Sequence, residues 1–414
     1  MLGRLQPLAK MVSRMSALLP DVDPDGLLEY SVVYTDRSVN HMSQRFRGAM
    51  NDIHATLTEV YSADRAVIVP GSGSFGMEAV ARQFARGKRC LVIRNGWFSY
   101  RWSQIFAAGS VPSDETVLCA QPTGDGVQAA FAPAAIDEVV ARIREQRPDV
   151  VFAPHVETSA GLMLPDDYLK AVADAVHAVG GLFVLDCVAS GTAWVNMRES
   201  GVDVVVSAPQ KGWSGSPCAG LVMLGERAVA ALDTTASDSF ALDLKKWSEI
   251  MQAYLDGAHA YHATMPTDAL IVFRDVMREI AGHGFETVMA RQAELGRRVR
   301  DALASRGFRS VAAEGFHAPG VAVYHTDSEA LSSGRAFVAE GLQIAAGVPL
   351  QIGEPEGFRT FRIGLFGLDK LVDVDGTVAR FEGALDRVMA NEGIGAESGR
   401  TADASERADA ALAN

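Results

Sequence analysis

The chain has 414 residues, of which 48% are hydrophobic and 21% are charged, and this composition suits a globular protein with a large core and a smaller companion. The formal net charge of −13 excludes a general binder of nucleic-acid backbones, because such proteins need clustered lysine and arginine to displace counterions. The four cysteines are widely spaced without a CxxC pair, so neither a metal site nor a disulfide framework is expected.

The N-terminal residues do not have the pattern of a targeting segment. Their apolar run is broken by Arg4, Lys10 and Arg14, so it lacks the continuous apolar region of a signal peptide. No stretch of the chain reaches the roughly 18 uninterrupted apolar residues of a membrane span. We therefore expect a cytoplasmic protein without a membrane partner.

From residue 43 onward, helical and strand-like patterns alternate along the chain. Apolar runs rich in valine, isoleucine and leucine and joined by helices are typical of a mainly parallel sheet covered on both faces. The sequence therefore predicts an α/β fold. The expected helices span 43–62, 75–85 and 165–181, and the expected strands lie within 65–70, 89–96, 149–157, 181–190 and 202–210.

The pattern changes near residue 267. Helical segments at 267–284 and 285–307 precede strand-like segments at 320–326 and 359–367, which predicts a smaller α+β domain. The last residues are small, polar and weakly periodic, as in a disordered tail. The expected division is an N-terminal arm at 1–30, a large domain at 31–267, a small C-terminal domain at 268–392 and a tail at 393–414.

Polar residues gather where the apolar runs end. Ligands of open parallel sheets bind beyond the carboxyl ends of the strands, so we expect the chemistry there. These positions hold Gly71 to Ser74, Asn95 to Phe98, Glu157 to Ser159, Asp186, and Gln210 with Lys211.

Lys211 and Asp186 are the most informative pair. Lys211 directly follows a strand too apolar to be exposed, and a desolvated amine there can attack an aldehyde cofactor. Asp186 ends an earlier strand, where its carboxylate can pair with a protonated pyridine nitrogen. Alone, each residue is more typical of a surface lysine or a turn-forming aspartate. Together, on neighbouring strands, they predict a site for pyridoxal 5′-phosphate (PLP).

The segment from Gly71 to Gly76 lies between a strand and a helix, where backbone N–H groups and the helix dipole favour a phosphate. Its sequence GSGSFG also fits the GxGxxG fingerprint of dinucleotide-binding proteins. That fingerprint requires an acidic residue about 20 positions further on, where this chain has Arg94 and Asn95. An NADP-binding oxidoreductase is the distant alternative.

Six motifs resemble, in order, those of the class V aminotransferases of PLP fold type I, most closely the alanine/serine–glyoxylate aminotransferases. The resemblance covers residues 45–390 and is carried by GSGSFGMEA, HVETSAG, LDCVAS, SAPQKGW, YHATMPT and FRIGLFG. It implies a mainly parallel seven-stranded sheet in the large domain. It also implies a transaminase that moves an amino group from alanine, serine, aspartate or an aminophosphonate to a small 2-oxo acid such as glyoxylate or pyruvate.

The resemblance further implies roles for single residues. Lys211 would hold PLP as a Schiff base and shuttle the proton in a ping-pong mechanism, and Asp186 would hold the pyridinium. Arg362 is similar to the arginine that clamps the substrate carboxylate, a task that suits its planar fork. The other implied contacts are Ser72, Gly73, Ser74 and Gln210 at the phosphate, Thr158 or Ser159 near the ring hydroxyl, and Phe98 or Trp97 stacked on the ring.

Tyr261 and Thr264 are similar to residues that reach the phosphate of the other subunit, so the resemblance implies a homodimer with shared active sites. The family's Gly-Pro-rich entry loop is missing, and LLEYSVVYTDRSVNHMS stands in that region. We hypothesise that residues 34–38 replace the loop and that Arg37 meets a second anionic group of the amino donor.

The nearest alternative is a PLP-dependent lyase or desulfurase of the same fold. Desulfurases of this fold carry a reactive cysteine on a separate loop near the small domain, whereas no cysteine follows Cys218 in this chain. His155 and His262 are expected to pack rather than react.

Overall fold

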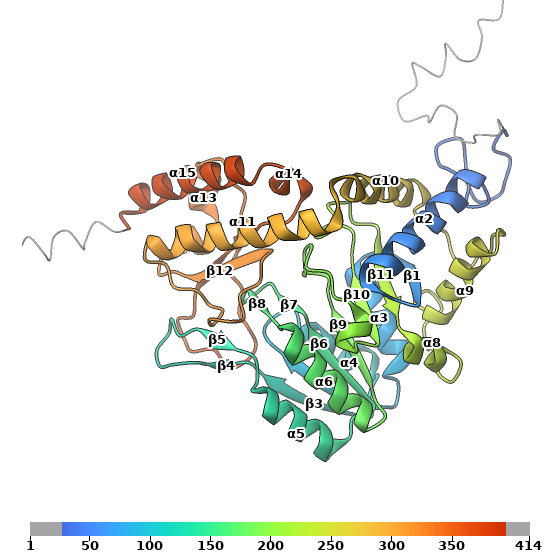
Figure 1. Cartoon of the computed structure of the whole chain (residues 1–414), viewed down its shortest axis with the longest axis horizontal. Coiled ribbons are helices and arrows are strands. Elements are labelled where there is room, and N and C mark those ends of the chain that lie inside the picture. The colour runs from blue at the N-terminus through green and yellow to red at the C-terminus, as the bar shows by residue number, and fades with distance from the viewer. Residues whose placement is uncertain (1–26, 395–414) are drawn as a thin grey trace, which may run out of the picture.

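The computed structural model describes residues 27–394. They form a central sheet covered by helices and a smaller unit built around a second sheet (Figure 1). Most of the arm expected at 1–30 and of the tail expected at 393–414 lies outside the described residues.

The central sheet has seven strands in the order β1-β11-β10-β9-β6-β2-β3. β11 (Ala219–Leu224) is antiparallel to both of its neighbours, and the remaining pairs are parallel. The carboxyl ends of β6, β9 and β10 therefore meet at one edge of the sheet. The α/β fold predicted from the sequence pattern and the mainly parallel seven-stranded sheet implied by the resemblance are both confirmed.

The central strands are apolar on both faces because helices cover both sides of the sheet. Every residue of β6 (VVFAP) and β10 (VVVS) is buried. α5 and α6 pack against each other on the near side of the sheet in Figure 1, and α3 and α4 pack against each other on the far side. This burial fixes the register and with it the positions of the residues that follow each strand.

The smaller unit contains a three-stranded sheet, β12-β14-β13, in which both pairings are antiparallel. α11 packs against α15 and β12, so the unit is of the predicted α+β type. α10 (Thr267–His283) contacts α11 and also α2 of the large unit. The expected boundary at residue 267 thus falls at the start of a helix that touches both units, and the division stays a prediction.

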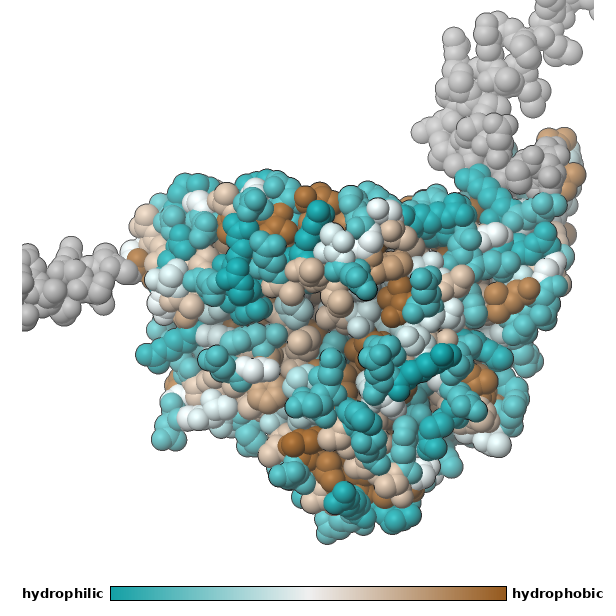
Figure 2. Space-filling model, in the orientation of Figure 1, coloured by the Kyte–Doolittle hydropathy of each residue, from teal (hydrophilic) through white to brown (hydrophobic). Residues whose placement is uncertain are grey.

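The face drawn in Figure 2 is mostly hydrophilic, with several small apolar patches spread over it. Leu28, Tyr30 and Val32 in the N-terminal segment are strongly exposed. Within residues 27–394, no helix combines the length and the apolar character that crossing a membrane requires.

The helices lie on both sides of the central sheet and around the second one. They are α2 (Gln44–Tyr61), α3 (Gly73–Phe84), α4 (Tyr100–Gly109), α5 (Ile136–Gln146), α6 (Asp166–Ala178), α7 (Met197–Ser200), α8 (Glu226–Leu232), α9 (Leu244–Leu255), α10, α11 (Phe285–Ser305), α12 (Glu329–Ser332), α13 (Arg335–Ala339), α14 (Leu368–Leu371) and α15 (Val374–Glu392). The strands are β1 (Arg65–Pro70), β2 (Arg89–Arg94), β3 (Asp114–Cys119), β4 (Gln121–Pro122), β5 (Phe131–Ala132), β6 (Val150–Pro154), β7 (Val156–Glu157), β8 (Leu162–Met163), β9 (Leu182–Asp186), β10 (Val204–Ser207), β11, β12 (Val321–His325), β13 (Ala345–Ala346) and β14 (Thr360–Gly364).

Candidate active site

A cavity of about 200 Å³ lies at the carboxyl edge of the central sheet, where β1, β6, β9 and β10 end. It collects residues from five separate segments of the chain. Of the expected cofactor residues, Ser72, Gly73, Ser74, Phe98, Thr158, Asp186, Gln210 and Lys211 line it, together with Met77, Arg101, Val156, Val188 and Ala189.

The N-terminus of α3 contributes to the cavity. Its N-cap is Ser72, whose side chain makes no capping hydrogen bond, and its first turn contains no acidic residue. The N–H groups of a first helical turn have no intrahelical partner, so this end attracts an anion. A Cβ added at Gly73 would lie 2.9 Å from Val188, so a side chain at this position would crowd the cavity wall.

Arg101, in α4, brings a positive charge to the same place. Its Nη1 donates a hydrogen bond to Ser74 Oγ at 2.7 Å, and within residues 27–394 it makes no ion pair with a carboxylate. A guanidinium without an acidic partner beside a helix N-terminus suits a phosphate. Arg101 is not among the residues predicted from the sequence, although its position three residues after Phe98 is an available signal.

Asp186 ends β9 and is 7% exposed. Burial raises the pKa of its carboxyl to about 6, against the opposing effects of a hydrogen bond from Val188 N and the charge of Lys211. The Val188 N–H lies 2.9 Å from Asp186 Oδ1. The carboxylate is thus held in a defined orientation in the cavity wall, where it can meet a protonated ring nitrogen.

Lys211 lies in the turn that follows β10 and faces the same cavity. A Cβ added at Gly212 would collide with Gly191 O, so the turn is packed directly against the neighbouring loop. Burial lowers the pKa of the Lys211 amine, whereas the charges of Asp186 and Glu157 raise it. A lysine with a lowered pKa carries more of the nucleophilic neutral amine near pH 7.

The geometry favours Phe98 and Thr158 over their neighbours as cofactor contacts, since both line the cavity and Trp97 and Ser159 do not. Ser159 is fully buried. Its Oγ accepts a hydrogen bond from Trp97 N at 2.9 Å and donates one to Glu157 at 2.7 Å. The hydroxyl of Ser159 is therefore already occupied within the protein.

Arg362, in β14, lies beside the cavity without lining it. Its Cζ is 5.5 Å from the centroid of the Phe98 ring, and Lys211 Nζ is 5.8 Å from the same centroid. A hydrogen bond of 2.8 Å from Arg362 Nε to Ala346 O holds the guanidinium in place. Burial lowers the pKa of Arg362 and the charge of Glu157 raises it. This position suits an arginine that receives the anionic group of a substrate.

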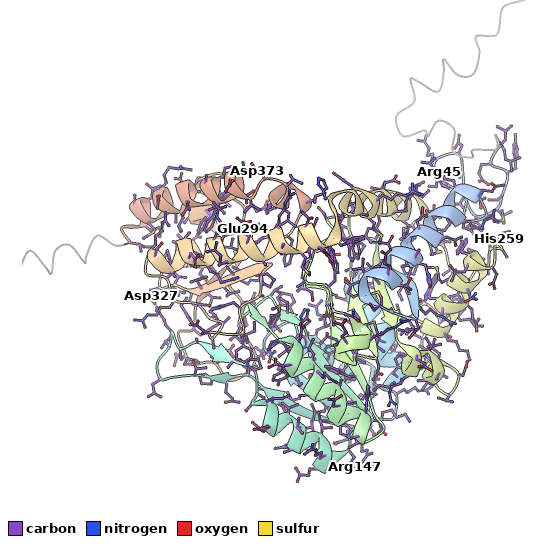
Figure 3. The ribbon with its side chains drawn as sticks, viewed as in Figure 1. Arg45, Arg147, His259, Glu294, Asp327 and Asp373 are labelled. Atoms are coloured by element: carbon purple, nitrogen blue, oxygen red, sulfur yellow. The ribbon has the colours of Figure 1, made fainter. Side chains whose placement is uncertain are left out.

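Tyr261 and Thr264 do not line the cavity of their own chain. Their side-chain oxygens are 3.0 Å apart, and Tyr261 is 55% exposed. Figure 3 labels the nearby His259 at the right-hand edge of the molecule. The described chain therefore does not bring Tyr261 and Thr264 together with Lys211.

Arg37 is exposed and also does not line the cavity. Its segment packs against the Tyr261 segment, since Tyr34 Oη donates a hydrogen bond to Met265 O at 3.2 Å. The N-terminal segment and residues 259–265 thus form one edge of the molecule.

The two histidines and the cysteine considered in the sequence are hydrogen-bonded or buried within the fold. His155 Nδ1 lies 2.8 Å from Ser190 Oγ, and burial lowers the pKa of His155 to about 4. His262 Nε2 lies 2.8 Å from Phe240 O. Burial raises the pKa of the Cys218 thiol to about 11, so little reactive thiolate is present near pH 7, which argues against the desulfurase alternative.

Comparison with known proteins places this geometry in a family. The chain matches the family model "Aminotransferase class-V" over residues 25–348. It is 28% identical over 374 residues to the 2-aminoethylphosphonate–pyruvate transaminase of Burkholderia ambifaria, covering 87% of this chain and 95% of that protein. Its structure is similar to alanine–glyoxylate aminotransferase from Nostoc sp., with a TM-score of 0.72 and 22% identity over 85% of this chain and 89% of the other. For ureidoglycine–glyoxylate aminotransferase from Bacillus subtilis the TM-score is 0.70 and the identity 20%, over 94% and 92%.

The fold and the family match define a PLP-dependent enzyme of fold type I. Within that class, the chain belongs to the class V aminotransferases and is a PLP-dependent transaminase. The dinucleotide interpretation of residues 71–76 is thereby excluded.

Proposed function

We propose that this transaminase moves an amino group from a small amino donor to pyruvate or glyoxylate, with Lys211 as the covalent anchor of the cofactor. The supporting observation is that the Lys211 amine, the buried Asp186 carboxylate and the N-terminus of α3 share one cavity. An amine, a carboxylate and an anion-binding helix end are the three groups that the aldehyde, ring nitrogen and phosphate of PLP require. Two half-reactions with ping-pong kinetics follow.

Each residue then has one task. When bound, PLP supplies an electron sink for the bonds at the donor carbon. Asp186 would hold the proton on the ring nitrogen, and Lys211, whose pKa is lowered by burial, would take the proton from the donor carbon and deliver it to C4′ of the cofactor. Arg101 and the N–H groups of Gly73 and Ser74 hold the phosphate. Gln210 assists at the phosphate, Phe98 covers the ring and Thr158 binds its hydroxyl.

We place 2-aminoethylphosphonate first as the donor and pyruvate as the acceptor. A relative aligned over most of the chain carries the name of that transaminase. The fork of Arg362 can bind a phosphonate or a carboxylate through two parallel hydrogen bonds, so one arginine can serve the donor and then the oxo acid. Alanine, serine and aspartate are the competing donors, and glyoxylate is the competing acceptor.

A spectral screen tests this proposal. Single donors are added to the purified holoenzyme, and the visible absorbance of the Lys211-bound cofactor is followed. We expect 2-aminoethylphosphonate to bleach the band at the lowest concentration and pyruvate to restore it. Arg362→Leu should raise the concentration needed for either half-reaction about tenfold or more, since a hydrogen-bonded charge pair is lost. A band that no donor bleaches would contradict the transaminase reaction proposed for this cavity.

We also propose a homodimer in which Tyr261 and Thr264 reach the phosphate site of the partner. Both side chains are polar and exposed at an edge that includes the exposed apolar residues of the N-terminal segment. A second copy that covers this edge would bury the apolar residues and complete the phosphate site.

If that edge meets the partner's cavity, Arg37 approaches the donor from the partner subunit. Arg37→Ala is expected to raise KM for the dicarboxylic donor aspartate about tenfold, because a charge-assisted hydrogen bond is lost, and to leave KM for alanine unchanged. Initial rates with both donors measure the difference. Equal kinetics for both donors in variant and wild type would remove Arg37 from the substrate site.

A further inference from the structure

Glu157 is a fully buried carboxylate at the end of β7, next to the cavity. Its Oε1 accepts hydrogen bonds from Phe98 N at 3.2 Å, Ser159 N at 3.0 Å and Ser159 Oγ at 2.7 Å. Its Oε2 accepts from Ser99 N at 2.8 Å and Ser99 Oγ at 2.7 Å. Five donors on one carboxylate hold it in one orientation.

The loop 95–99 depends on this carboxylate for its shape. Asn95 N and Gly96 N donate to Ser99 Oγ at 2.9 and 3.1 Å, and Trp97 N donates to Ser159 Oγ at 2.9 Å. Glu157 itself accepts the N–H groups of Phe98 and Ser99. Every backbone N–H group of the loop is therefore bound either by Glu157 or by a serine hydroxyl that donates to Glu157. A Cβ added at Gly96 would collide with Ser159 Oγ, so the loop lies tightly on the network. Phe98 is therefore held at the cavity by Glu157.

The charge of Glu157 also acts on the reacting groups. It interacts electrostatically with Lys211, with Arg362 and, repulsively, with Asp186. The other charges that act on Lys211 are Asp186, which favours its protonated form, and Arg362 and Arg101, which oppose it. Glu157 thus offsets the charges of two arginines around the amine without lining the cavity.

We propose that Glu157 is a positioning residue of this transaminase: its carboxylate shapes the loop that places Phe98 over the cofactor and supplies the buried negative charge that balances Arg362 and Arg101 around Lys211. The inference rests on the proposed cofactor site at Lys211. It assigns to Glu157 a mechanical effect through the loop and an electrical effect through the charge, and the two effects can be measured separately.

Glu157→Gln tests both effects in the holoenzyme. The visible band of the bound cofactor reports whether the Lys211 nitrogen carries its proton, so its pH titration reads the local electrostatics. Removing a nearby negative charge disfavours the protonated nitrogen, so the midpoint should move to lower pH by about one unit. A glutamine accepts at one end only and turns a donor toward the other N–H groups, so the cofactor dissociation constant should rise about tenfold.

Two variants separate the effects. Ser99→Ala keeps the charge of Glu157 and removes one of its hydrogen-bond donors. It should weaken cofactor binding and leave the titration midpoint unchanged. Glu157→Asp is the alternative variant if Glu157→Gln does not fold. It keeps the charge and should behave like Ser99→Ala. Glu354→Gln is the matched control, because that carboxylate also accepts loop N–H groups, from Leu350 and Ile352, but does not act on Lys211.

An unmoved midpoint in Glu157→Gln, or an equal shift in Glu354→Gln, would overturn the electrostatic part. Unchanged cofactor affinity in both Glu157→Gln and Ser99→Ala would overturn the loop part. Failure of the underlying site looks different, because wild-type protein would then show no visible band and no borohydride-trapped adduct on Lys211.

Discussion

Lys211→Ala is expected to abolish the visible band of the holoenzyme and to lower transamination about 10³-fold or more. The variant removes both the covalent anchor and the group that moves the proton, and a positioned acid–base group alone contributes about 10²- to 10⁴-fold. The pocket retains Asp186 and the N-terminus of α3, so PLP should still bind without a covalent link. Peptide mass spectrometry after borohydride treatment should find the adduct on Lys211 in wild type and none in the variant.

Lys170→Ala is the matched control, because Lys170 lies exposed on α6 in an ion pair with Asp174. It should keep the band, the adduct and the activity.

Mixing Lys211→Ala subunits with Tyr261→Ala subunits adds a test of the shared site. A mixed dimer would contain one site with both Lys211 and the partner's Tyr261 intact, so activity should return on mixing. No gain over the separate variants would contradict the shared site, and full activity of Lys211→Ala alone would contradict the anchor.

Lys211 and Asp186 were predictable because their positions follow from burial. Asp186 ends one apolar strand and Lys211 comes after another, and both strands are so apolar that they must lie inside the sheet. Parallel strands bring their carboxyl ends to one edge. The phosphate end was predictable for a similar reason, since a glycine-rich turn between a strand and a helix exposes backbone N–H groups. These inferences need only the order of the elements along the chain.

Arg101 and the Glu157 network were not predictable in this way. The sequence pattern identifies Glu157 only as a strand-end residue, because its partners are backbone N–H groups of a loop whose path the pattern does not give. The hydrogen bond from Arg101 to Ser74 joins α4 to α3, and no sequence motif links these two helices. In the proposed dimer, the neighbours of Tyr261 and Arg37 would depend on how two copies meet, and the sequence pattern of one chain does not give that arrangement.

Asp186→Asn is expected to lower transamination about 10²- to 10³-fold and, at the same time, to stabilise the cofactor-free protein at neutral pH. The activity falls because the amide cannot hold a proton on the ring nitrogen, so charge developing on the cofactor is less stabilised. The stability rises because a buried charge is removed while Oδ1 can still accept the Val188 N–H. The rise of the Asp186 pKa from 3.8 to about 6 corresponds to a cost of roughly 3 kcal/mol in the ionised wild type. That figure already includes the attraction of Lys211 and the hydrogen bond from Val188, both of which lower the pKa of Asp186.

The difference in unfolding free energy between Asp186→Asn and wild type should depend on pH. The folded protein binds the Asp186 proton more tightly than the unfolded chain, so the cost of the charge grows as pH rises from about 4 to about 6 and is complete above that. Urea unfolding of cofactor-free protein should therefore show the variant more stable than wild type at pH 7.5, with the difference vanishing near pH 4. Asp203→Asn is the contrasting control, because Asp203 is equally buried but paired with His177 and Arg227, and its loss should destabilise the fold at pH 7.5. If Asp186→Asn destabilised the cofactor-free protein as Asp203→Asn does, Asp186 would be a structural residue rather than a charge kept in the cavity for the cofactor.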